Sequence, residues 1–171
     1  MYFYLVLLGI LLGMLAVLFN SQLMRVMTWF RPVSMVWRLI LAALITGTIG
    51  MFIPEALGAN FIDVEHLFDS SPGALLLVST LVFKVILAVF AIGLGIPGGI
   101  IGPVMVIGML AGAVLLLPLS YFIDVPEFTN SFALLGIAGM LTAVLHAPLA
   151  ALSAVMELSY SPQIILPAML V

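Results

Sequence analysis

The chain has 171 residues, of which 65% are hydrophobic and only 6% are charged, whereas soluble domains are about half apolar and a quarter charged. This composition excludes a soluble fold. The formal net charge of −3, without any run of Lys and Arg, argues against a nucleic-acid partner. Because the chain has no cysteine, it has no thiolate metal site, and we expect neither a metal nor another cofactor.

Three apolar stretches in the first half predict membrane helices. Residues 2–27 predict a long and tilted first helix. Residues 39–53 predict a second, and residues 74–92 predict a third with Lys84 near its middle. A membrane helix takes about 20 apolar residues, so we expect a single all-α membrane domain over residues 1–171.

The charges around the first two helices predict their orientation. Arg25, Arg31 and Arg38 are three of the four basic residues, and they lie in and around one connection. The positive-inside rule places that connection in the cytoplasm. The segment that follows Pro54 carries acidic charges only, as expected of the outer face.

Residues 93–103 form a break rich in glycine and proline. Seven of these eleven positions are Gly or Pro, and no charged residue lies between Val85 and Ile123. A helix cannot run through such a segment, yet nothing nearby resembles a solvated loop. The break is therefore predicted at membrane depth, where irregular backbone is tolerated only if it is buried in protein or lines a cavity.

The second half of the chain predicts shorter elements. Residues 104–119 and 132–145 predict helices separated by a polar connection at residues 124–130. His146-Ala147-Pro148 interrupts the pattern, and residues 149–160 are too short to span a bilayer. Short hydrophobic segments interrupted by proline are typical of a transport site.

The glycine-rich break has the features of an anion site. A helix that begins at about Ile101 presents unpaired N–H groups and a partial positive charge. Gly98, Gly99 and Gly102 let an ion approach the amides, and Pro103 fits the first turn, where no donor is needed. The alternative is a kink at which the glycines serve close helix packing.

The sequence resembles the CLC family of chloride channels and chloride/proton antiporters. Residues 95–103, Gly-Ile-Pro-Gly-Gly-Ile-Ile-Gly-Pro, are similar to the family's Gly-x-Phe-x-Pro region. Further segments similar to the family, in the same order and at similar spacing, are residues 54–58, 132–140, 146–149, 156–157 and 163–167. The resemblance covers nearly the whole chain.

The resemblance implies a function and a site. It implies transport of chloride or similar anions, by a channel or a Cl⁻/H⁺ antiporter, with the central ion bound by the backbone amides of Ile100 and Ile101. The family commonly has Phe at the position of Ile101 and Ala at that of Gly102. Because backbone makes the contact, we expect the site to survive these departures while pore width changes.

The resemblance also implies an assembly. Family subunits have two inverted halves, of which this chain resembles the second, so we expect the chain to belong to a longer protein whose N-terminal half holds the gating glutamate. It implies a homodimer with one pore per subunit, and a multi-pass protein of the lipid bilayer, expected in the cell membrane.

Other functions remain open from the residues. An unrelated secondary transporter of small carboxylates would also use broken helices, and the segment alone could be inactive and serve folding or dimerisation. An enzyme is disfavoured because the apolar interior offers little besides Lys84 and Glu157. Lys84 is expected to snorkel or to pair with a carboxylate, or else to add positive potential to the ion path. A metal site at residues 63–69 is a weaker alternative.

Overall fold

The computed structural model describes residues 2–52, 54–57, 74–96, 98–117, 126–159 and 165–171, and every regular element in these ranges is helical. The elements in chain order are α1 (Tyr2–Phe30), α2 (Met35–Phe52), η1 (Pro54–Ala56), α4 (Ala74–Gly93), α5 (Ile101–Leu116), α6 (Pro126–Leu145), α7 (Pro148–Ser159) and α8 (Ile165–Leu170). The all-α prediction is confirmed.

The chain divides into two compact units. The first unit comprises Met1–Val17 and Val104–Val171, and the second unit comprises Leu18–Pro103. Helix α1 contributes its first residues to the first unit and the remainder to the second. The prediction of a single membrane domain concerns folding in a bilayer and stays a prediction.

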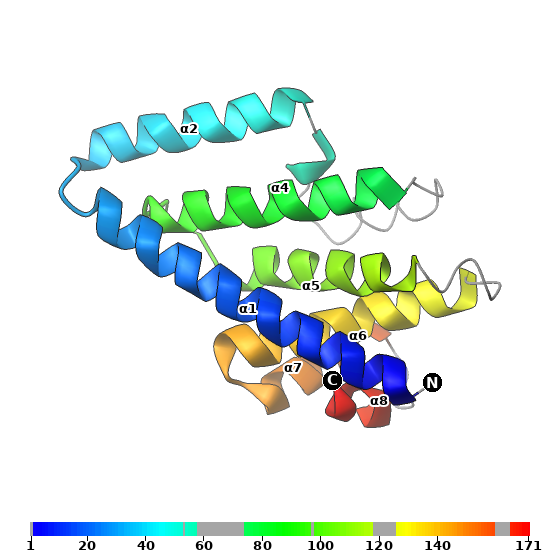
Figure 1. Cartoon of the computed structure of the whole chain (residues 1–171). Coiled ribbons are helices and arrows are strands. Elements are labelled where there is room, and N and C mark those ends of the chain that lie inside the picture. The colour runs from blue at the N-terminus through cyan, green and yellow to red at the C-terminus, as the bar shows by residue number, and fades with distance from the viewer. Residues whose placement is uncertain (1, 53, 58–73, 97, 118–125, 160–164) are drawn as a thin grey trace. The chain divides into compact units, whose positions relative to one another are not determined.

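Helices α2 and α4 form the body of the second unit. They lie side by side, and η1 contacts both of them (Figure 1). The C-terminal half of α1 packs on the end of α4, where a Cβ built on Gly93 would lie 2.6 Å from Val26 Cγ1. Glycine at position 93 therefore permits the close approach of α1 and α4.

Helix α4 ends in a Schellman motif. The Gly95 N–H donates to the Ile92 carbonyl at 3.0 Å, and the Ile96 N–H donates to the Ala91 carbonyl at 3.1 Å. Gly95 has a φ of 84°, the left-handed conformation that this cap requires and that glycine adopts without a Cβ penalty. The break after α4 is thus encoded by a glycine at the position where the helix must stop.

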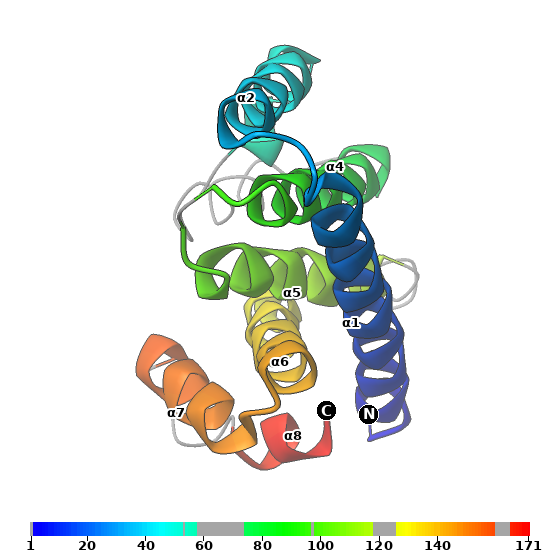
Figure 2. The ribbon, with the colours of Figure 1, turned by 90° about the vertical axis from the view of Figure 1, so that its left-hand side faces the viewer.

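The first unit is built on α5 and α6. Their backbones touch, because Cβ atoms built on Gly108 or Gly136 would overlap the partner glycine's carbonyl oxygen. Helices α7 and α8 contact each other and α6 (Figure 2). Val171 at the end of the chain lies against Gly9 of α1 and Gly139 of α6.

Three of the described helices are long and apolar enough to cross a membrane, namely those over Tyr4–Phe30, Met35–Phe52 and Ala74–Gly93. They match the three helices predicted in the first half. At 16 residues, α5 is about 24 Å long, which is less than the roughly 30 Å of a hydrocarbon core. The interruption at His146-Ala147-Pro148 is confirmed, since α6 ends at Leu145 and α7 begins at Pro148.

One predicted boundary is wrong. Residues 124–130 were expected to form a polar connection, whereas α6 already begins at Pro126. Proline suits the first helical position because its missing N–H would have no partner there. Polarity alone was therefore a poor indicator of a loop at this point.

Candidate anion site

The break separates α4 from α5 as the sequence predicts. Helix α4 ends at Gly93, and α5 begins at Ile101. Residues 98–100, between them, are outside any helix. The first N–H groups of α5 have no carbonyl of their own helix to bind, so the helix presents donors and a partial positive charge toward the break.

Three glycines of the break, at positions 98, 99 and 102, face open space within the part of the chain that the structure describes. A Cβ built on Gly98, Gly99 or Gly102 would meet no atom within 4 Å. A Cβ on Gly108 or Gly136, at the crossing of α5 and α6, would collide with backbone. Within the described residues, close packing therefore explains the glycines of the helix crossing but not Gly98, Gly99 and Gly102.

Two further residues at the start of α5 fit an ion site. Ile101, the first residue of α5, is 54% exposed among the described residues. Pro103 is the third residue of α5, where the N–H would lack an intrahelical partner in any case. Proline therefore costs no helical hydrogen bond at this position.

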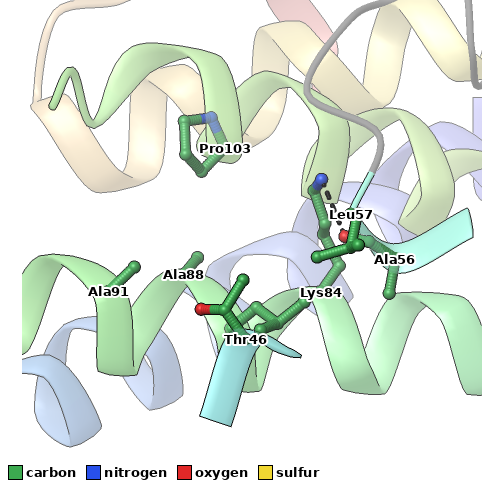
Figure 3. A pocket seen from close by; sticks show the side chains of 8 residues that line it. Thr46, Ala56, Leu57, Lys84, Ala88, Ala91 and Pro103 are labelled. Carbon is green, nitrogen blue, oxygen red and sulfur yellow. Dashed lines mark hydrogen bonds between the residues drawn. The ribbon is translucent and has the colours of Figure 1, made fainter. Parts of the chain in front are cut away.

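A cavity of about 200 Å³ in the second unit is bordered by the start of α5 (Figure 3). The cavity brings together residues that are far apart in the sequence. Its lining comprises Thr46 from α2, Ala56 and Leu57 from the turn at η1, Lys84, Leu87, Ala88 and Ala91 from α4, and Pro103. Sequence reasoning identified Pro103 and Lys84 separately and did not place them at one cavity.

Lys84 is buried in this cavity wall. Its side chain is 7% exposed, and its Nζ donates a hydrogen bond to the Ala56 carbonyl oxygen at 3.0 Å. Figure 3 shows the lysine side chain reaching the carbonyl of Ala56 beside Leu57. The ammonium of Lys84 therefore binds a backbone carbonyl among the described residues. The expectation that Lys84 snorkels or pairs with a carboxylate stays a prediction.

A second cation lies near the break. A Cβ built on Gly95 would lie 3.8 Å from Arg38 Nη1, so the guanidinium is beside the turn that ends α4. The Arg38 Nε is buried and has no hydrogen-bond partner among the described residues. A cation beside a helix C-terminus is favoured by the helix dipole.

The other polar candidates lie elsewhere. Glu157 is on an exposed side of α7, and His146 lies between α6 and α7 with a φ of 54°. No group of three potential metal ligands occurs among the described residues. The acidic segment at residues 63–69, weighed as a metal site, lies outside them.

Apolar helices of membrane-spanning length, with a glycine break that opens a helix N-terminus, define an integral membrane protein of the broken-helix type. The chain belongs to the family described as Voltage gated chloride channel, whose sequence profile matches residues 1–171. The resemblance to the CLC family is thereby confirmed.

Two kinds of relative are similar to this chain. The H(+)/Cl(-) exchange transporter ClcA of Klebsiella pneumoniae is 31% identical in a match that covers 98% of this chain and 37% of the relative. The Voltage-gated ClC-type chloride channel ClcB of Escherichia coli is 29% identical over 136 residues, covering 79% of this chain and 32% of the relative. The chain spans about a third of the length of these curated relatives.

Proposed function

We propose that this chain is part of a protein that moves chloride or similar anions across a membrane, and that the backbone amides of Ile100 and Ile101 hold the ion. The observation that carries the proposal is the start of α5 at Ile101, beside glycines whose Cα atoms face open space. Family membership supports it, because one relative is named as a chloride channel and another as a proton/chloride exchange transporter.

Backbone amides suit this task physically. A chloride ion that leaves water needs donors to replace its hydration shell, and the first turn of a helix supplies several at once. A transport site must also release its ion, and amide dipoles hold an anion less tightly than a fully charged side chain in contact with it. Lys84 and Arg38 would add positive potential from the surrounding residues without direct contact.

The proposed pore includes parts of the protein beyond these 171 residues. Since this chain spans 32–37% of its relatives, we propose that a first inverted half with the gating glutamate, and a second copy of the subunit, complete the protein. The connection with Arg25, Arg31 and Arg38 is proposed to face the cytoplasm. The reaction is transport, in which no covalent bond changes, so no catalytic residue is proposed.

Liposome flux tests the function. The complete native protein, reconstituted into vesicles loaded with chloride, should release chloride when a potassium ionophore collapses the opposing voltage, as recorded by a chloride electrode. Release no faster than from protein-free vesicles would contradict the proposal. Addition of protons to the outside distinguishes the two transport modes, since an antiporter couples chloride movement to a pH change.

The same vesicles test the other functions. Membership of the family argues against an unrelated carboxylate transporter, which would show uptake of a small carboxylate that chloride does not compete with. The folding or dimerisation role concerns residues 1–171 alone, and chloride release from vesicles that contain only this segment would contradict it.

A further inference from the structure

A second cavity in the second unit lies between the C-terminal half of α1 and the middle and end of α4. It has a volume of about 610 Å³, within the roughly 300–1,000 Å³ typical of small-molecule sites. Its walls include Arg25, Trp29 and Phe30 from α1, and Val85, Ile86 and Phe90 from α4. We refer to this cavity as the α1/α4 groove.

Helical periodicity explains how the groove forms. Positions 22, 25, 26 and 29 share one face of α1, and positions 86, 89 and 90 share one face of α4. The two helices touch where Val26 meets Gly93, and Figure 2 shows this part of α1 beside α4. The groove therefore has apolar walls from both helices and one cation, Arg25, from α1.

The position of the groove along α1 places it near a membrane surface. Helix α1 has 29 residues and is about 44 Å long, longer than the roughly 30 Å hydrocarbon core. Its polar residues are near the C-terminal end, where Gln22 and Arg25 line the groove. Trp29, 77% exposed, is of the type that gathers at the level of the lipid headgroups.

We propose that the α1/α4 groove binds an anionic phospholipid of the leaflet at the C-terminal end of α1. An acyl chain would lie along Phe30, Ile86 and Phe90, and the headgroup phosphate would meet Arg25. Charge complementarity favours this occupant, because basic residues between membrane helices attract anionic headgroups while the apolar walls disfavour a water-soluble anion. The inference goes beyond ion transport and does not depend on it.

Brominated lipids test the groove directly, because bromine quenches tryptophan fluorescence on contact. The complete native protein is reconstituted in phosphatidylcholine vesicles that contain the same mole fraction of brominated phosphatidylglycerol or brominated phosphatidylcholine. Subtraction of the spectrum of the W29F variant isolates the signal of Trp29. We expect Trp29 to prefer the brominated anionic lipid by roughly fivefold in apparent affinity.

Two charge variants provide the matched control. Arg25 and Arg31 are both exposed, but only Arg25 lines the groove. R25Q should abolish the preference for the anionic lipid, and R31Q should retain it. Native mass spectrometry after detergent extraction gives a second measurement. The native protein should retain more anionic lipid than phosphatidylcholine, and R25Q should lose this excess.

Several outcomes would overturn the proposal. Equal quenching by the two lipids would mean general contact with the bilayer, and absence of quenching would mean that a protein segment fills the groove. An equal loss of the preference for anionic lipid in R25Q and R31Q would mean a diffuse charge effect. Each of these results can occur while chloride flux is normal, so failure here is distinguishable from failure of the transport proposal.

Discussion

The ammonium of Lys84 in α4 donates a hydrogen bond to the carbonyl oxygen of Ala56 in η1, over 3.0 Å. This contact links two segments that are 28 residues apart in the sequence. It holds the turn after α2 against α4 and forms one wall of the cavity that Pro103 also borders. Lys84 therefore stabilises this turn by its hydrogen bond, and it also places a positive charge at the cavity that the start of α5 borders.

Replacement of Lys84 tests its contribution to stability and its contribution to chloride binding by two different measurements. Lys84→Met keeps an unbranched side chain, one atom shorter, but removes the donor. It should lower the free energy of unfolding by about 1–3 kcal/mol, because a buried carbonyl loses a charged partner. Lys84→Arg, the matched control, keeps the charge and the donors and should lose less stability than Lys84→Met. Thermal unfolding in detergent measures the first effect. Chloride affinity should fall in Lys84→Met as well if the charge acts on the ion.

The crossing of α5 and α6 should not tolerate a methyl group. In Gly136→Ala the new Cβ would overlap the Gly108 carbonyl, and backbone cannot move aside as a side chain can. We expect a loss of about 1–3 kcal/mol in stability. Gly47→Ala in α2 is the control, since nothing lies within 4 Å of its Cβ position. The control should be neutral or more stable, and equal unfolding midpoints for the two variants would contradict the close crossing.

His146 should be replaceable by glycine with a gain in stability. Its φ of 54° lies in the left-handed region, which is unfavourable for a residue with a Cβ. His146→Gly should raise the free energy of unfolding by about 0.5–1 kcal/mol. Ser153→Gly, at an exposed position within α7, should instead lower it by about as much. A lower unfolding midpoint for His146→Gly would show that the histidine side chain stabilises this turn.

Sided labelling tests the proposed orientation. This chain has no cysteine, and any cysteine elsewhere in the complete protein would first be replaced. Cysteine at the exposed Pro32, in the basic connection, should react with a membrane-impermeant maleimide from the cytoplasmic side only. Cysteine at the exposed Leu57 should react from the opposite side. Labelling of Pro32→Cys from outside would reverse the orientation.

The sequence predicted the helices well where apolar length was decisive. The spans of α1, α2 and α4 followed from hydropathy, and the end of α4 followed from glycine and proline, because these residues determine backbone conformation locally. The start of α6 was missed because a polar segment can still be helical when a proline begins it. Polarity predicts solvent contact better than it predicts a loop.

The candidate site was only partly accessible from the sequence. The break and Ile101 could be located, since the signal is local. Lys84 meets Ala56, and Thr46 lies with Pro103 at one cavity, because of how α2, η1 and α4 pack together. A single sequence does not show which residues of these elements come into contact. The distinction between open glycines at the break and packed glycines at the helix crossing likewise required the structure.

Chloride binding to the Ile101→Pro variant tests the central claim most directly. Proline is tolerated at the first position of α5 but removes the amide that is proposed to hold the ion, whereas Ile101→Val keeps the amide. In calorimetric titrations of the complete native protein, Ile101→Pro should bind chloride more weakly by about 1 kcal/mol or more, and Ile101→Val should bind it as the unmodified protein does. Equal chloride affinity of Ile101→Pro and Ile101→Val would contradict the backbone-amide site.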